Sequence, residues 1–352
     1  MPKQGVLTSG DKQRIKISHF IFHIIITDED IPHYLDEVVM TDEQQKFFKD
    51  RLIDSSTGTQ YLFLEKDKSD LVRSIKEIIN NPEEKFIEKS RELASNFVRF
   101  HKKTMSDGVY IISLIKLYDN TPLLYLVKMD QKKVLRYKVE STDTGKRAIL
   151  EEIINTFVED KNAIQKSAII DIGEYYQWDV LAFDRSKDGG KGITDYFRNY
   201  LGVIEREDAS VLTRKAVNAV RQWATIYSED LDEDPSIFKE RAIQYLKTHD
   251  TFDSEEFMNM VVYEEDYEKK SLMLKSLREY LSEEGIFGQV FSPKPESLSK
   301  ADQKNIRETA EGVRLEWLGS AKSKGIKVPS KVDPSDNLYH ISIYTRSIKT
   351  IS

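Results

Sequence analysis

Cysteine is absent from this chain of 352 residues. Disulfides, thiolate zinc sites and cysteine nucleophiles are therefore excluded, and a reducing compartment is consistent with the composition. Long apolar runs are absent as well, because stretches such as Phe20–Ile26 are too short to span a bilayer. Met1–Lys16 is polar and basic, without the apolar centre of a signal peptide. We therefore expect a cytoplasmic protein with no membrane partner.

Signatures of catalysis are also missing. The chain contains no Gly-x-Ser-x-Gly, no HExxH and no Rossmann fingerprint after an expected strand. A metal-dependent nuclease needs clustered carboxylates, but the nearest string, Glu83-Glu84-Lys85, opens an expected helix. We predict that the protein is not an enzyme and has no catalytic residue, metal site or cofactor, with a metal-dependent nuclease as a third alternative.

Neither sign of charge dominates, since 53 Lys and Arg stand against 60 Asp and Glu, a net charge of −7. The charge is distributed unevenly along the chain. Residues 227–311 hold 21 acidic and 11 basic side chains, whereas residues 128–147 and 312–352 each hold 7 basic and 3 acidic ones. Basic segments on either side of an acidic one permit local contact with phosphates.

Apolar periodicity in the first half predicts an α+β fold with helices and a mainly antiparallel sheet. Thr41 and Gln44 form an expected capping box, and Pro82 opens a further helix. Between them, one face of an expected helix carries Leu71, Ile75, Ile78 and Ile79. Ile149, Ile153, Ile154 and Phe157 predict a helix after a strand meander. The expected strands are Ile15–Thr27, Tyr61–Leu64, Val109–Leu117, Leu123–Met129, Val134–Val139, Ala168–Ile172 and Trp178–Phe183.

The pattern beyond this point is mainly helical. An aromatic helix, Thr194–Leu201, is expected to end at Gly202 as its C′ residue. The boundary near Glu205 gives two predicted domains, an α+β domain of residues 1–204 and a mainly helical domain of residues 205–352. The second is expected to contain a helix at Ser210–Tyr227 and two further helices that begin at Asp234-Pro235 and at Asp253 with Glu256. The helical pattern continues up to Leu281, and the expected closing strands are Val313–Leu318 and Tyr339–Tyr344.

Two groups of side chains have the residue types of a cation site. His19 and His23 share one side of an expected strand, so their imidazoles could meet at a metal, but hydrogen-bonded core or edge histidines are the simpler interpretation. The acidic runs Glu229–Asp234 and Glu264–Asp266 lack the pattern of an EF-hand and fit a solvated linker and a helix face. Such acidic helices also suit a basic protein partner.

The loop Gly189-Gly190-Lys191-Gly192 offers backbone amides and a lysine just before a helix. It departs from a Walker A loop, because Arg185 stands at the position of the first glycine and Gly192 at that of Ser/Thr. The pattern fits a strand-to-helix connector, with contact to a DNA phosphate as the functional alternative.

Basic side chains cluster around this loop, on the helix after Gly202 and near the C-terminus. On a helix from Ser210, Arg214 and Arg221 are seven apart and share a face. An ordinary solvated surface is the competing interpretation. The candidate DNA-binding residues are Lys187, Lys191, Arg198, Arg206, Arg214, Lys215, Arg221, Lys322, Lys324 and Lys327, with Lys331 beside the last group.

The strand Asp179–Phe183 is followed by the Gly-Lys loop and by the aromatic helix Ile193–Gly202, which ends in Tyr-Leu-Gly. This central order resembles the nucleoid-associated protein NdpA family of bacteria. The chain departs from the family in its longer charged N-terminus and its Ile- and Lys-rich composition. Further similar segments, in the same order, are Ile17–Ile24, Leu123–Asp130, Gly312–Trp317 and Asp333–Tyr339.

The resemblance implies a protein of the bacterial nucleoid that binds DNA, with contact to a DNA-handling enzyme such as a type II topoisomerase. It carries over no catalytic residue. Our first hypothesis is a nucleoid-associated DNA-binding protein of weak sequence specificity, because no base-reading motif is present. The alternative is a protein–protein adaptor that docks such an enzyme through its acidic helical half. A homodimer is left open.

Overall fold

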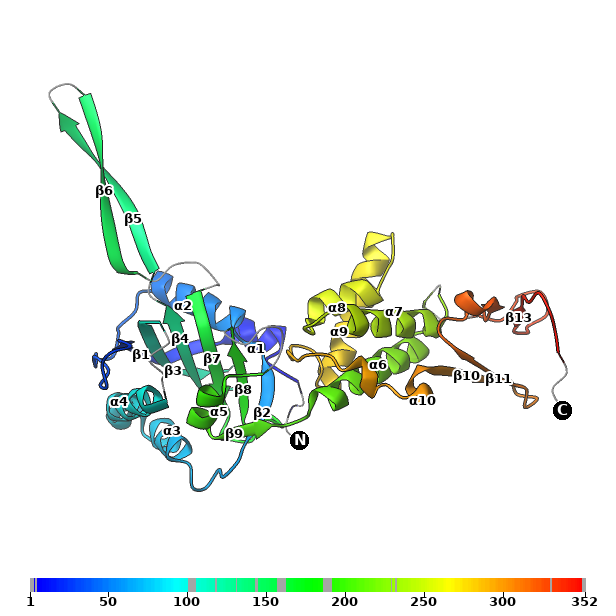
Figure 1. Ribbon diagram of the computed structural model, residues 1–352, viewed down its shortest axis with the longest axis horizontal. Helices are drawn as coiled ribbons and strands as arrows, with labels where there is room; N and C mark the ends of the chain where they lie inside the picture. Colours follow the sequence, from blue (N-terminus) through cyan, green and yellow to red (C-terminus); the bar gives the residue numbers. More distant parts are fainter. Residues whose placement is uncertain are drawn as a thin grey trace. The chain divides into compact units, whose positions relative to one another are not determined.

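The computed structural model describes residues 3, 5–100, 106–117, 119–130, 132–142, 145–156, 163–185, 192–228, 230, 231, 233–329 and 331–349. They divide into two compact units. The first is formed mainly by Leu7–Asp188 and Gly192–Arg206, and the second by Lys3–Val6 and Glu207–Ser352. The first unit is built on a sheet and the second is mainly helical (Figure 1), so the predicted α+β class is confirmed.

A seven-stranded sheet forms the centre of the first unit, in the order β1-β3-β4-β7-β8-β2-β9. Every neighbouring pair in it is antiparallel. The turn between Val109–Leu117 and Leu123–Met129 forms as predicted, because β3 and β4 pair along their full length. The strands are β1 (Lys16–Ile25), β2 (Thr59–Phe63), β3 (Gly108–Lys116), β4 (Pro122–Asp130), β7 (Ile164–Ile170), β8 (Val180–Asp184) and β9 (Val203–Glu205).

Helices cover both faces of this sheet. Tyr110 and Ile112 of β3 point to the face where Phe97 stacks on the Tyr110 ring at 4.4 Å. Leu52 contacts the opposite face, beside Val127 of β4. Alternate residues of one strand therefore enter two different cores. The helices of this unit are α1 (Ser9–Arg14), α2 (Asp42–Asp54), α3 (Asp70–Asn80), α4 (Pro82–Phe100) and α5 (Asp195–Leu201).

The predicted helix starts form as the local sequence dictates. Thr41 Oγ1 accepts from the backbone N–H of Gln44, and the Gln44 side chain accepts from the Thr41 N–H in return. This reciprocal pair satisfies two donors that the first turn of a helix leaves open. Pro82 stands at the first position of α4, where the missing N–H costs nothing.

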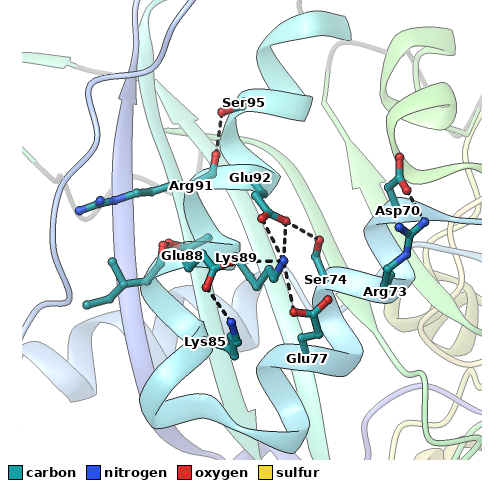
Figure 2. Close-up of polar contacts among 12 residues, drawn as sticks. Asp70, Arg73, Ser74, Glu77, Lys85, Glu88, Lys89, Arg91, Glu92 and Ser95 are labelled. Carbon is teal, nitrogen blue, oxygen red and sulfur yellow. Dashed lines mark hydrogen bonds and ion pairs between the residues drawn. The ribbon is translucent and has the colours of Figure 1, made fainter.

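The pair α3 and α4 is held together at its surface by one lysine. Lys89 Nζ lies 2.9 Å from Glu92 Oε1, 3.2 Å from Glu77 Oε2 and 3.6 Å from Glu88 Oε1 (Figure 2). Ser74 donates to Glu92 across the same pair of helices. Hydrogen bonds to Glu92 first, and then to Glu77, hold the pKa of Lys89 well above its usual value because they stabilise its charged form, although burial opposes the shift. The charge of Lys89 is therefore taken up by carboxylates of the two helices.

One predicted helix is wrong. Residues 145–156, which contain Ile149, Ile153 and Ile154, form the strand β6 (Gly145–Thr156). It pairs with β5 (Lys132–Thr142) in a separate two-stranded ribbon (Figure 1), so the predicted strand Val134–Val139 exists but does not extend the meander. A spacing of four puts Ile149 and Ile153 on one face in a helix and in a strand alike, so it does not discriminate. Phe157 lies outside the described residues.

The second unit is a bundle around buried aromatic rings. Its helices are α6 (Ala209–Ile226), α7 (Pro235–Thr248), α8 (Ser254–Val261), α9 (Tyr267–Glu283) and the short α10 (Lys300–Gln303). Trp223 of α6 is fully buried, and its indole N–H donates to Ser276 Oγ of α9 at 3.1 Å. Asp208, Asp234, Asp253 and Asp266 each accept a backbone N–H at the start of the helix that follows, which confirms the predicted starts at Asp234 and Asp253.

The C-terminal strands agree only in part with the sequence pattern. The predicted strand Val313–Leu318 is observed as β11 (Arg314–Leu318). It pairs with β10 (Lys304–Glu308), a strand that the sequence analysis did not predict. The predicted strand Tyr339–Tyr344 reduces to β13 (Ser342–Ile343), paired with β12 (Ile326–Lys327). Pairing over two residues is all that the exposed backbone of this segment forms. Among the described residues, no helix is long and apolar enough to cross a membrane.

Gly202 ends α5 in the left-handed conformation, as predicted, with φ 66° and ψ 44°. A Cβ there would meet no atom within 4 Å, so only backbone strain opposes a side chain. We expect Gly202→Ala to lower the free energy of unfolding of the first unit by about 1 kcal/mol, and Gly202→Asn to lower it less, because Asn tolerates this conformation better. Chemical denaturation measures both. Gly10→Ala in α1 is the control, and equal stability of Gly202→Ala and wild type would contradict the account.

Candidate nucleic-acid interface

The connector that carries the Gly-Lys loop is fixed at both of its ends. Asp184, the last residue of β8, accepts hydrogen bonds from the Thr194 backbone N–H at 2.8 Å and from its hydroxyl at 2.7 Å. Thr194 is the N-cap of α5, and Gly192 before it has φ 72°. Residues 186–191, and with them the predicted contacts Lys187 and Lys191, lie outside the described residues. The structure thus describes only the two ends of the predicted connector, and the strand-to-helix interpretation of its glycines stays a prediction.

Three charged side chains form a row beneath this connector. In the register of the sheet, Lys128 of β4 lies opposite Lys166 of β7, and Lys166 lies opposite Asp184 of β8. Lys166 Nζ lies 2.5 Å from Asp184 Oδ1 and 4.9 Å from the centre of the Tyr196 ring. All three charged side chains are buried. Lys128 Nζ also lies 3.7 Å from Asp130 Oδ1, so each buried lysine has a carboxylate nearby, but burial still disfavours the charged form of both.

Burial is the main cause that lowers the pKa values of both lysines. The pKa of Lys128 falls to about 8, with Asp130 opposing the shift and Lys166 adding to it. The pKa of Lys166 is lowered by burial as well, although Asp184 beside it favours the charged form. These buried cations help to position the connector, and their burial keeps them from phosphates in solvent.

Three of the predicted DNA contacts are held by acceptors of the chain itself. Arg206 donates to Gln60 Oε1 at 2.6 Å and to Gln177 Oε1 at 2.5 Å. Lys215 Nζ donates to both oxygens of Glu207, at 2.9 and 3.0 Å. Arg198 lies 3.8 Å from Asp195 and 3.9 Å from Glu205. A phosphate has to compete with these acceptors, so each of the three cations is a weaker candidate than its sequence position indicated.

The other predicted contacts of the second unit are exposed. Arg214 and Arg221 lie on α6, and neither makes an ion pair with any residue that the structure describes. Lys322 and Lys324 belong to a single turn, η4 (Lys322–Lys324), which Gly325 ends with φ 67°. Lys327 follows in β12 and is exposed too. Arg221 lines a cleft of the second unit, and none of these three lysines lines it. The three lysines therefore form a group apart from Arg221.

Two cations that the sequence analysis counted within the acidic segment lie beside Arg221. Lys304 and Arg307 of β10 line the same cleft as Arg221. A sequence signal for them existed, because Ala310-Glu311-Gly312 is a plausible turn before the predicted strand Val313–Leu318 and so implies a partner strand. The basic surface of the second unit is therefore assembled from residues far apart in the chain.

The histidines and acidic runs have local partners. His23 is buried, contacts Ser90 Oγ at 3.2 Å and accepts from the Leu35 N–H, and burial lowers its pKa to about 4. His19 lies 2.8 Å from Glu37. In the acidic runs, Glu233 pairs with Arg241, while Asp234 and Asp266 cap helices. In the part of the chain that the structure describes, no group of three or more His, Asp or Glu could hold a metal.

Comparison with known proteins identifies one similar family. The family model described as nucleoid-associated protein YejK matches residues 21–316, from β1 in the first unit to β11 in the second. No curated protein matches the chain.

The buried row predicts a pH-dependent stability. Because the folded-state pKa of Lys128 is about 8 against an ordinary value of 10.5, folding disfavours its charged form. The buried charge therefore lowers the free energy of unfolding of the wild type below pH 8, and this loss disappears as the pH rises to 10.5. We expect Lys128→Met to raise the free energy of unfolding at pH 7 by about 1–3 kcal/mol, and the gain to shrink towards pH 10. Denaturant titrations at both pH values measure this.

The exposed Lys76 of α3 provides the matched control, as Lys76→Met. If Lys128→Met were less stable than wild type at pH 7, or if its difference from wild type did not change with pH, the buried charge of Lys128 would not lower the free energy of unfolding as we describe.

Proposed function

The chain belongs to the nucleoid-associated protein YejK family, and on this premise we propose that it binds chromosomal DNA through exposed cations of its second unit. Membership confirms the resemblance of the sequence to the NdpA family. It also assigns the protein to the nucleoid, in the bacterial cytoplasm, and to the organisation of the chromosome.

The observation that supports the proposal best is the exposure of Arg214 and Arg221 on α6. A cation already held by a carboxylate must break that pair to bind a phosphate, whereas an exposed cation only releases water and counterions. The lysines Lys322, Lys324 and Lys327 satisfy the same condition in a segment much later in the sequence. These five side chains are the phosphate contacts that we propose.

Recognition through such contacts depends little on the base sequence. Phosphate contacts position a protein on a duplex, whereas base edges in the grooves carry the sequence information. The described helices do not carry a recognised base-reading motif, and the proposed contacts are all Lys or Arg on a helix surface and a turn. We therefore propose weak sequence preference and a strong dependence of affinity on salt.

An architectural role of this kind needs no catalysis, and we propose that the protein is not an enzyme. The adaptor hypothesis, with a type II topoisomerase docked through the acidic half, stays a prediction. Many carboxylates of that half already have partners: Glu255 pairs with Arg278 at 2.7 Å, and Glu233 with Arg241 at 2.6 Å. Paired carboxylates attract a basic partner less than free ones. The homodimer also stays a prediction.

Duplex DNA titrated at several salt concentrations tests the proposed contacts. We expect the logarithm of the binding constant to fall linearly with the logarithm of the salt concentration. Arg214→Ala and Arg221→Ala should each reduce the slope by about one unit and weaken binding equally for unrelated sequences. Lys215→Ala, which removes a cation already paired with Glu207 one position from Arg214, is the matched control and should change the slope less.

Fluorescence anisotropy with a labelled duplex gives the slopes directly. Absence of binding at low salt would refute DNA binding itself. An equal effect of Lys215→Ala and Arg214→Ala would refute the importance of the internal ion pair.

A further inference from the structure

An open cleft of about 680 Å³ lies within the second unit, between α6, α7, α9 and β10. Arg221 lines it from α6, and Lys304 and Arg307 line it from β10. The polar side chains of Gln222, Asn305 and Tyr280 complete its wall. Among the described residues, no Asp or Glu side chain lines it. In a unit whose sequence is rich in carboxylates, this is a local surface of the opposite sign.

The three cations differ in how firmly the protein holds them. Arg307 is fixed, because it lies 3.3 Å from Asp234 Oδ2 and over the Trp317 ring at 5.8 Å. Lys304 forms an ion pair with Glu316 across the hairpin. Arg221 is exposed and makes no ion pair with the described residues. The cleft thus combines two positioned cations with one whose charge is uncompensated.

A fourth cation lies buried beside this group. Lys239 of α7 donates to the Lys304 carbonyl at 2.8 Å and thereby ties α7 to β10. Burial lowers the pKa of Lys239 to about 8, and repulsion from Arg221 and Arg307 contributes, while Asp302 opposes it. Two arginines of the cleft thus repel the charged form of the buried Lys239 amine. An anion placed between them would relieve this repulsion.

We propose that this cleft binds a single nucleotide through its phosphate group. Its volume lies within the roughly 300–1,000 Å³ of small-molecule sites. The guanidinium of Arg221 can hold two phosphate oxygens at once, with Arg307 and Lys304 opposite. Ile226 and Ile306 line the same cleft with 64% and 44% of their surfaces exposed, and they offer apolar surface to the sugar or the base.

This ligand class goes beyond duplex binding. The phosphates of a duplex lie on a wide convex surface and are reached by exposed helices and turns, whereas a concave site suits one projecting nucleotide. The same chemistry has two sources, a free nucleotide and the 5′-phosphorylated end of a single strand. The proposal is independent of whether Arg214 and the lysines of η4 contact duplex DNA.

Calorimetric titration of the full chain at low salt tests the proposal, with adenosine 5′-monophosphate, inorganic phosphate and adenosine as probes. We expect the two phosphates to bind and adenosine not to bind. Arg221→Ala should weaken binding of the monophosphate about tenfold or more, because it removes a charge-assisted contact. Arg214→Ala removes the other exposed arginine of α6 outside the cleft, so it is the matched control and should leave the affinity unchanged.

Arg221 is the residue to change because its exposed side chain holds no other element, and thermal unfolding checks that the variant folds. Competition between the monophosphate and a 5′-phosphorylated single strand tells the two sources apart, and Arg221-dependent binding of either supports the proposal. Absence of phosphate binding, or equal loss in Arg221→Ala and Arg214→Ala, would overturn it. Duplex titrations of the same variants show separately whether DNA binding itself fails.

Discussion

The competition for each lysine and arginine between acceptors of the chain and phosphates of a ligand governs what this protein can bind. The chain carries more acids than bases, and many of the described cations have a carboxylate or amide within reach, as Lys89, Lys215 and Arg206 do. A phosphate gains little from a cation that must first leave such a partner. The cations best suited to a phosphate are therefore those that the fold separates from carboxylates, as it does for Arg214 and Arg221 on α6 and for the lysines of η4.

Burial also removes some lysines from contact with phosphates. Lys128, Lys166 and Lys239 are withdrawn from solvent, where the cost of a buried charge lowers their pKa values. They contribute to architecture: Lys166 with Asp184 supports the connector before α5, and Lys239 ties α7 to β10. Lys128 and Lys166 of the first unit and Lys239 of the second thus contribute to internal structure, whereas Arg214 and Arg221 of the second unit are exposed.

Local chemistry made much of the fold predictable. Caps such as Thr41 with Gln44, Pro82 and Gly202 act within a few residues, and the continuous apolar runs of β3 and β4 indicate strands that are buried on both faces. The ribbon was missed because a spacing of four suits a helix and a strand alike. The availability of cations was not predictable, because it depends on distant partners: Arg206 binds Gln60, 146 residues earlier in the chain. Lys304 and Arg307 of β10 line the same cleft as Arg221, although they lie far from it in the sequence. The domain boundary near Glu205 and the roles of the proposed contacts stay predictions.

The central claim is that the second unit, and not the helix pair α3 and α4 of the first, faces DNA. Hydrogen–deuterium exchange of the full chain with and without duplex DNA tests it most directly. The account predicts that DNA slows exchange in α6 and in the segment from η4 to β12 and leaves α3 and α4 unchanged. Slower exchange confined to α3 and α4, where Lys89 is surrounded by carboxylates, would contradict it.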